Sequence, residues 1–227
     1  MIPSEEHKIS MFPMDFEEFL WAIGDEVSAE TIRYLIKNKK AAGNAMHRNL
    51  MRTFRLYMLV MLSSYTVNIA YHANNPDVGM SLEKDAGRYK LFNSDVGLFI
   101  TLAFKDKKYT ENIIYNKLLS DKLDVNLGYV YENVVAQMLI AKGNNLFYYT
   151  MKSETSNHLY EIDFLTSVKD KICPLEVKSG NYRTHKSLDV FCNKFSNRIG
   201  GKYVVHTKDY KWENGIYYIP MYMVPFL

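Results

Sequence analysis

Three observations predict an α/β protein with a mixed sheet flanked by helices. Apolar residues recur at helical spacing through much of residues 15–62, which predicts a small helical region. From residue 128 onward the pattern changes to helix, three strands, helix and strand. Between the two lies a segment rich in Asn, Pro and Gly at residues 72–79, which is typical of a loop. We therefore expect a helical region over residues 1–75 and an α/β domain over residues 76–227.

The composition indicates a protein with a packed core. Hydrophobic residues make up 48% of the 227 residues, so disorder is not expected. The formal net charge of +3 is too small to indicate a nucleic-acid partner and does not exclude one. Cys173 and Cys192 lack metal-ligand spacing and fit a reducing cytosol. No signal peptide is visible, and the apolar stretch at residues 56–62 is far shorter than a membrane span, so we expect a cytoplasmic protein without a membrane partner.

The helical region is predicted to contain three helices. Acidic residues favour the start of the first helix near residue 15. Ser28 is expected to cap the second helix, and the third is predicted over residues 45–62. Beyond the loop, residues 89–92 predict a short strand and residues 96–103 a helical segment.

The α/β domain is predicted from sharper signals. Val130, Val134 and Met138 form one row of an amphipathic helix, which Gly143 ends. Alternating or aromatic-rich segments then predict strands. The expected elements are a helix at residues 128–142, strands at residues 146–151, 159–168 and 172–178, a helix at residues 185–199 and a strand at residues 202–207.

Two neighbouring strands are expected to present charged residues toward one spot. Because side chains alternate between the faces of a strand, Glu161 and Asp163 should share one face. The other face should carry the apolar side chains, Tyr160, Ile162 and Phe164. In the next strand, Glu176 and Lys178 share a face in the same way. The short connection between the two strands permits a hairpin that brings them together.

This combination suggests a metal site. Carboxylate oxygens suit Mg²⁺, a hard cation that takes oxygen ligands. Lys178 would orient the attacking water or stabilise charge on a phosphate. Carboxylates and a lysine close together would also shift one another's pKa values, as in many functional sites. A solvated, salt-bridged sheet face explains any single pair of these charges better, so only their combination favours a site.

The order of elements and residues resembles the PD-(D/E)XK nuclease superfamily. Asp163 is followed after thirteen positions by Glu176, and Lys178 completes the Glu-x-Lys pattern. The resemblance implies a restriction-endonuclease-like core, with Asp163 and Glu176 as metal ligands and Lys178 as a catalytic residue. Glu132 matches an acidic residue that the superfamily often has on its first helix, and the resemblance implies a catalytic and metal-binding role for it too. Ile162 stands where the motif name has proline, a frequent departure.

Five segments narrow the resemblance. They lie at residues 12–20, 90–98, 131–133, 161–164 and 176–180. In this order they resemble the C-terminal part, including a domain of unknown function, of a family of bacterial and archaeal AAA-type ATPases. The phosphate-cradling Gly-x-x-x-x-Gly-Lys-Ser/Thr motif does not occur, so no ATPase activity is expected from this chain. The winged-helix-like segment of the family is also much shortened here, and a separate ATPase or another protein is an open possibility as partner.

The leading hypothesis is a Mg²⁺- or Mn²⁺-dependent nuclease that hydrolyses phosphodiester bonds in DNA or RNA. The alternative is a non-catalytic module that binds nucleic acid or protein, since one fold serves many functions. Arg48, Arg52 and Arg55 fall at helical spacing and either follow a phosphate backbone or form a solvated helix face. The oligomeric state stays open.

Overall fold

The computed structural model describes residues 14–60, 67–94, 127–153 and 156–227. Its helices are α1 (Phe16–Ala22), α2 (Glu26–Lys37), α3 (Asn44–Val60), α6 (Leu127–Ala141) and α7 (Lys186–Lys194), with the 3₁₀ helices η1 (Ser196–Arg198) and η2 (Met221–Phe226). Its strands are β1 (Val67–Ala73), β2 (Lys84–Asn93), β3 (Leu146–Lys152), β4 (Leu159–Val168), β5 (Lys171–Val177), β6 (Tyr203–His206), β7 (Lys211–Glu213) and β8 (Ile216–Pro220).

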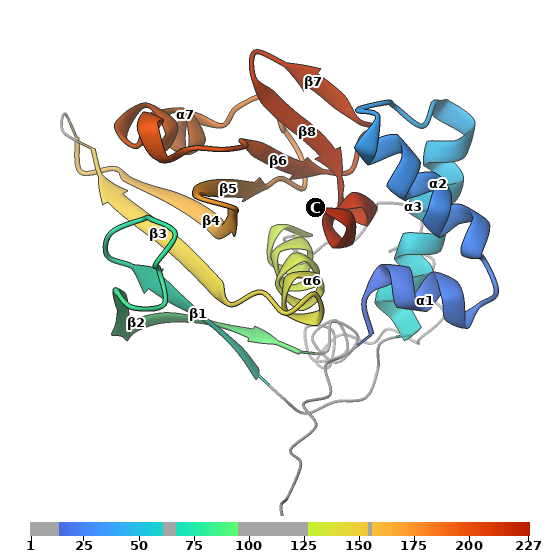
Figure 1. The fold of residues 1–227 in the computed structure, drawn as a ribbon, viewed down its shortest axis with the longest axis horizontal. Helices are drawn as coiled ribbons and strands as arrows, with labels where there is room; N and C mark the ends of the chain where they lie inside the picture. The colour runs from blue at the N-terminus through green and yellow to red at the C-terminus, as the bar shows by residue number, and fades with distance from the viewer. Residues whose placement is uncertain (1–13, 61–66, 95–126, 154–155) are drawn as a thin grey trace, which may run out of the picture.

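The described strands form one mixed sheet. Its eight strands follow the order β2-β1-β3-β4-β5-β6-β8-β7. Helices lie on both faces of this sheet (Figure 1), and the α/β class predicted from the sequence is therefore confirmed. None of the helices in the described ranges is long and apolar enough to cross a lipid bilayer.

Helices α1 and α2 begin where acidic side chains cap them. The Asp15 carboxylate accepts a hydrogen bond of 2.8 Å from the backbone N–H of Glu18, and the Glu18 carboxylate accepts one of 2.9 Å from the N–H of Asp15. At α2, the Asp25 carboxylate accepts a hydrogen bond of 3.2 Å from the N–H of Ser28. The prediction of Ser28 as the cap is wrong, because Asp25 lies three residues earlier and reaches that free donor.

Two apolar layers hold the helices to the sheet. On one face, α1 to α3, α6 and η2 share a cluster that includes Phe16, Phe54 and Tyr57, whose ring centroids lie 5.1 to 5.7 Å apart. On the other face, α7 packs through Leu188 and Phe191. The N-terminal helices are therefore part of the core on the α6 face.

The sheet begins before the boundary expected at residue 75. Strand β1 pairs antiparallel with β2 and parallel with β3. The region predicted to be helical over residues 1–75 is thus helical in α1 to α3 and contains a strand at Val67–Ala73. The strand expected at residues 89–92 is the longer β2, and the helical segment expected at residues 96–103 lies outside the described residues.

From residue 127 onward the elements follow the predicted order. Helix α6 precedes the antiparallel strands β3, β4 and β5, and α7 then connects β5 to its parallel neighbour β6. Helix α7 ends at Lys194, earlier than predicted, and η1 continues the turn. Strands β7 and β8 and the helix η2, which follow β6, are absent from the sequence prediction.

Strand β4 contains an irregularity that moves one predicted side chain. Phe147 pairs with Leu165 and Tyr149 with Ile162, so three steps along β4 correspond to two along β3. As a result, Phe164 packs on the α6 face, whereas Ile162 and Leu165 pack on the α7 face. The prediction that Phe164 and Ile162 share a face is wrong, because the bulge reverses the alternation between them.

Candidate functional site

The charged residues predicted from the sequence gather where β4 and β5 stop pairing. Phe164 and Leu175 are the last residues of the two strands that pair on this side. Beyond them, an oxygen of the Asp163 carboxylate accepts a hydrogen bond of 2.8 Å from the backbone N–H of Val177. The Asp163 side chain therefore satisfies a backbone donor at the end of the ladder, next to Glu176.

The Asp163 carboxyl group lies in surroundings that disfavour its ionised form. Burial, and then the negative charge of Glu132, raise the pKa of Asp163 to about 8. The hydrogen bond from Val177 and the charge of Lys90 oppose this shift, whereas the charge of Glu176 adds to it. Burial also raises the pKa of Glu132, which lies near the start of α6. A carboxyl group such as that of Asp163, which keeps its proton near neutral pH, is typical of functional sites.

Glu176 and Lys178 form an ion pair at the end of β5. The Nζ of Lys178 lies 2.6 Å from Oε1 of Glu176, and the Lys178 side chain is the more exposed of the two, at 28% against 6%. The second oxygen of Glu176, Oε2, is buried and has no hydrogen-bond partner within the described residues. Leaving a buried acceptor unsatisfied is costly, so this oxygen is suited to receive a cation or a donor.

Asp163 and Glu176 approach the strand ends from different faces of the sheet. Glu176 pairs with Val204 of the α7-face cluster, and after the larger effect of burial its charge contributes to the raised pKa of Cys192 on α7. Asp163 has its largest charge interaction with Glu132 on α6. The two carboxyl groups still interact, but they do not share one face as simple alternation predicts, because Asp163 lies in the bulged part of β4.

Lys90 is a member of the charged cluster that sequence reasoning did not assign to the site. It lies on β2, forms an ion pair with Glu161, and has its Nζ 5.2 Å from the ring centroid of Tyr148. Burial lowers the pKa of Lys90, but the hydrogen bond to Glu161 and the charges of Asp163 and Glu132 raise it by more. The signal that could have found Lys90 is its place at the start of the segment 90–98.

Asn133 fixes α6 against the end of β2. Its Oδ1 accepts a hydrogen bond of 2.8 Å from the backbone N–H of Asn93, and its Nδ2 donates one of 2.6 Å to the Asn93 carbonyl. Glu132 immediately precedes Asn133 on α6. These two hydrogen bonds therefore fix α6, and with it Glu132, relative to β2 and Lys90.

The donor set suits a divalent cation held by few protein ligands. Asp163 and Glu176 supply carboxylate oxygens, one of them buried without a partner among the described residues. Mg²⁺ is commonly held by one or two carboxylates and several waters. Within the described ranges, no group of three His, Cys, Asp or Glu residues is arranged to hold a metal ion together. The structure therefore does not join Glu132 with Asp163 and Glu176 in one coordination group.

Comparison with known proteins identifies a family that resembles the second half of the chain. Residues 127–224 match the model of a family described as Domain of unknown function (DUF4143). No curated protein and no solved structure matches the chain. The matched region runs from α6 into η2 and contains Glu132, Asp163, Glu176 and Lys178, whereas Lys90 precedes it. The predicted site thus lies within the part of the chain that is similar to this domain of unknown function.

Proposed function

We propose that this protein is a Mg²⁺- or Mn²⁺-dependent nuclease with a restriction-endonuclease-like core. The proposal is carried by the positions of Asp163, Glu176 and Lys178 at the end of the β4–β5 ladder, where the charges of Asp163 and Glu176 interact. The order α6, β3, β4, β5, α7, β6 agrees with the order that the superfamily resemblance implies. Because one fold hosts many functions, the proposal rests on the charged cluster more than on the fold.

The residues of the cluster have distinct roles in the proposed reaction. Asp163 and Glu176 hold the cation through their carboxylate oxygens. The bound cation supplies polarisation of a phosphate oxygen and a more acidic water. Lys178, which is partly exposed, turns from Glu176 to the phosphate and stabilises its negative charge. Glu132 adds negative charge that attracts the cation, and Asp163 must lose its proton before it can bind, so activity should rise with pH toward about 8.

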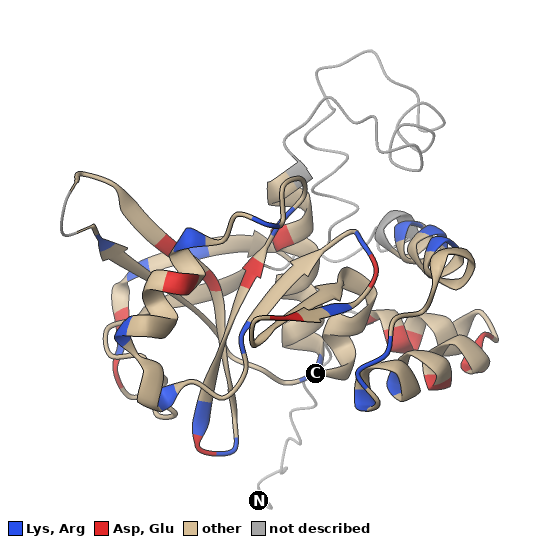
Figure 2. Cartoon of the chain, turned by 90° about the horizontal axis from the view of Figure 1, so that it is seen from above, with Lys and Arg blue, Asp and Glu red and all other residues tan. Residues whose placement is uncertain are grey.

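A basic groove supports nucleic acid as the substrate. Helix α3 carries three arginines and no acidic residue (Figure 2). A cavity of about 460 Å³ is lined by Arg48, Arg52 and Arg55 of α3 and by Lys208. With the residues that the structure describes, Arg48, Arg52 and Lys208 form no ion pair, so their charges are suited to phosphate groups.

The groove and the charged cluster lie along the same edge of the sheet. Strands β5 and β6 are parallel, so their C-terminal ends lie side by side. Lys178 follows the end of β5, and its backbone N–H donates a hydrogen bond of 2.8 Å to the carbonyl of Val205 in β6. Lys208 lies two residues beyond the end of β6. A phosphate backbone seated in the groove would therefore run toward Lys178.

The test is cleavage of DNA and RNA by the purified chain with Mg²⁺ or Mn²⁺ in excess. Asp163→Asn and Lys178→Ala should each lower the cleavage rate by about a hundredfold or more. Asp170→Asn, the same chemical change in the exposed β4–β5 turn, is the matched control and should retain full activity. Arg48→Ala with Arg52→Ala should weaken nucleic-acid binding and reduce its salt dependence while sparing the rate at saturation. Cleavage that persists in Asp163→Asn would refute the proposal.

A second candidate function is a non-catalytic module that binds nucleic acid or protein. The observation that favours it is the pairing of Lys178 with Glu176 and of Lys90 with Glu161, which already compensates two of the acids. Calorimetric titration with Mn²⁺ separates the two candidates. The nuclease requires a binding signal that Asp163→Asn removes, whereas a silent titration supports the binding module.

A further inference from the structure

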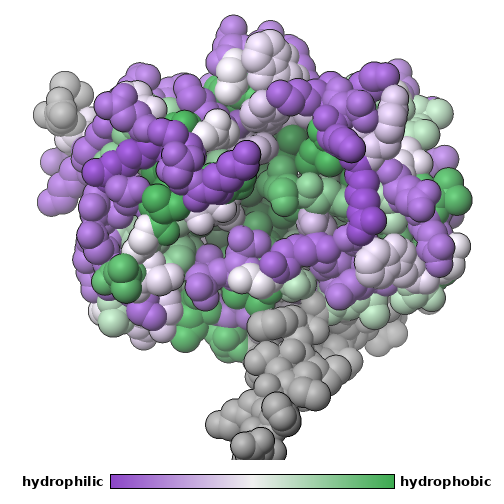
Figure 3. All heavy atoms as spheres, viewed as in Figure 1, coloured by the Kyte–Doolittle hydropathy of each residue, from purple (hydrophilic) through white to green (hydrophobic). Residues whose placement is uncertain are grey.

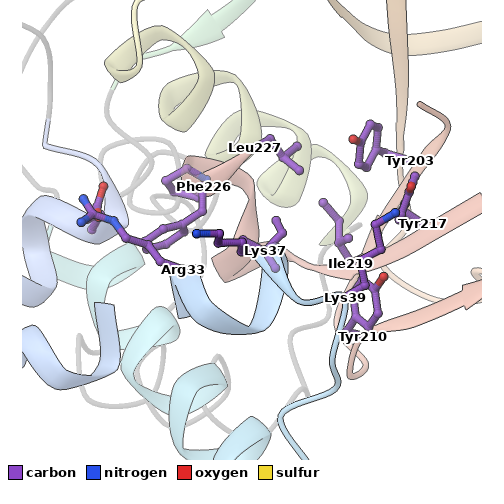
Figure 4. A pocket seen from close by; sticks show the side chains of 12 residues that line it. Arg33, Lys37, Lys39, Tyr203, Tyr210, Tyr217, Ile219, Phe226 and Leu227 are labelled. Atoms are coloured by element: carbon purple, nitrogen blue, oxygen red, sulfur yellow. The ribbon is translucent and has the colours of Figure 1, made fainter. Parts of the chain in front are cut away.

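A second cavity lies between α2 and the C-terminal strands. Its volume is about 500 Å³, which is within the range of small-molecule pockets. Figure 3 shows a hollow with apolar residues inside and hydrophilic residues around it, and Figure 4 shows the side chains that line the cavity. Its lining shares no residue with the charged cluster or the basic groove within the described chain.

Tyrosine rings form one wall of this cavity. Tyr203 of β6 and Tyr217 of β8 stack, with ring centroids 5.2 Å apart and an interplanar angle of 21°. Tyr210 lies beside them (Figure 4) and is only 8% exposed, and its buried hydroxyl has no hydrogen-bond partner among the described residues. Burial raises the pKa of Tyr203 to about 12 and also raises the pKa of Tyr210, so both hydroxyls stay protonated and can donate.

The rim of the cavity is basic. Arg33 and Lys37 of α2 and Lys39, which follows α2, line it together (Figure 4). The acidic lining residue Glu17 is buried and already paired with Arg33 and with Lys142, whose Nζ lies 2.7 Å away. Neither Lys37 nor Lys39 forms an ion pair within the described ranges. The rim therefore offers two uncompensated positive charges to an anion.

Lys39 lies where the basic rim of the cavity adjoins the tyrosine wall. The Nζ of Lys39 lies over the ring of Tyr217, 5.3 Å from its centroid, so a cation stands against the aromatic surface. A ligand that contacts both the rim and the wall must carry a flat apolar body next to its negative charge.

We propose that this cavity binds a small aromatic anion of the nucleoside monophosphate class. The base would pack against the tyrosine wall, and an acceptor on the base would satisfy the buried Tyr210 hydroxyl. The phosphate would pair with Lys37 and Lys39. An aliphatic anion would lack a flat body to pack against the tyrosine wall, and a neutral aromatic compound would leave the lysines without a negative partner. The site is independent of the proposed nuclease function.

Calorimetric titration of the full chain with adenosine 5′-monophosphate, adenosine and inorganic phosphate tests the proposal. The monophosphate should bind at least about tenfold more tightly than adenosine or phosphate, because each of these keeps only half of the contacts. The double variant Lys37→Ala with Lys39→Ala should lower the affinity for the monophosphate about tenfold and leave the affinity for adenosine unchanged. Lys84→Ala is the control, since Lys84 also stands over a tyrosine, 4.4 Å from the ring centroid of Tyr71, but on the outer strand β2.

The Tyr210→Phe variant tests the buried hydroxyl. It keeps the ring and removes a group that has no partner among the described residues, so the melting temperature should not fall, while both adenosine compounds should bind more weakly. Loss of affinity together with a lower melting temperature would count against a ligand contact of Tyr210. The proposal is overturned if the monophosphate does not bind, if phosphate alone binds as tightly, or if the double lysine variant binds as the wild type does.

Discussion

Asp163→Asn should make the stability of the metal-free protein less dependent on pH. The folded chain keeps a proton on Asp163 up to about pH 8, whereas an unfolded chain loses it near the ordinary value of 3.8. Between these two values the folded state binds more protons than the unfolded state. The free energy of unfolding should therefore fall as the pH rises through this window, and the amide side chain of the variant, which cannot ionise, removes this contribution.

The size of the effect follows from the proton balance. One extra proton bound in the folded state lowers the free energy of unfolding by at most about 1.4 kcal/mol per pH unit. Between pH 5 and pH 8 this amounts to about 4 kcal/mol. Asp163 keeps some exposed surface, where solvent screens the interactions that shift its pKa, so we expect about 2 kcal/mol over this range. The amide oxygen introduced by the Asp163→Asn substitution can still accept the hydrogen bond from Val177, so the fold should be retained.

Urea unfolding in a chelating buffer, measured at one-unit steps from pH 5 to pH 9, determines this slope. The free energy of unfolding of the wild type minus that of Asp163→Asn should become more negative as the pH rises. Asp170→Asn, in the exposed turn after β4, should follow the wild type. If wild type and Asp163→Asn lose or gain stability in parallel across the range, the buried, proton-holding environment of Asp163 is refuted. Added Mg²⁺ should stabilise the wild type above pH 7 and leave the variant unchanged.

Three further changes test the framework around the site. Burial lowers the pKa of His206 to about 4, so the neutral side chain contributes its full stabilisation above about pH 6.5 and loses it as the pH falls toward 4. His206→Asn, which keeps an acceptor, should flatten this decline in acid unfolding curves. An unchanged decline would contradict this reasoning. Asn133→Ala should cost about 1–3 kcal/mol in urea unfolding, because both backbone groups of Asn93 lose their partner, and a neutral result would refute this role of the two hydrogen bonds. Phe54→Ala should cost about 3–5 kcal/mol, since Phe54 is fully buried among aromatic rings; a loss below about 1 kcal/mol would show that the N-terminal helices are not part of the core.

Local sequence patterns were sufficient for the elements that carry the candidate site. Helix α6 and strands β3, β4 and β5 lie close to their predicted positions. Their apolar residues repeat at helical or alternating spacing because each element buries one or both faces against the same core. The identities and order of Glu132, Asp163, Glu176 and Lys178 could be read in the same way, as could their confinement to consecutive elements.

Strand β1 and the contact of Lys90 with the charged cluster could not be predicted, because both depend on distant pairing. Ala70 of β1 pairs with Leu146 of β3, a partner more than seventy positions away. Lys90 reaches the charged cluster only because β2 pairs with β1 and β1 with β3. Neither the pairing of β1 with β3 nor the pairing of β2 with β1 produces a periodic pattern in the neighbouring residues of the sequence.

The sequence by itself determined that this is an α/β chain with four candidate site residues on one helix and two neighbouring strands. Only the tertiary structure decided how they meet. The bulge in β4 turns Asp163 toward Glu132, while β5 directs Glu176 toward α7, so the two carboxyl groups interact at the end of the ladder from different faces of the sheet. The physical reason is that alternation fixes faces only in a regular strand, whereas bulges and long-range pairing are set by packing against residues elsewhere in the chain.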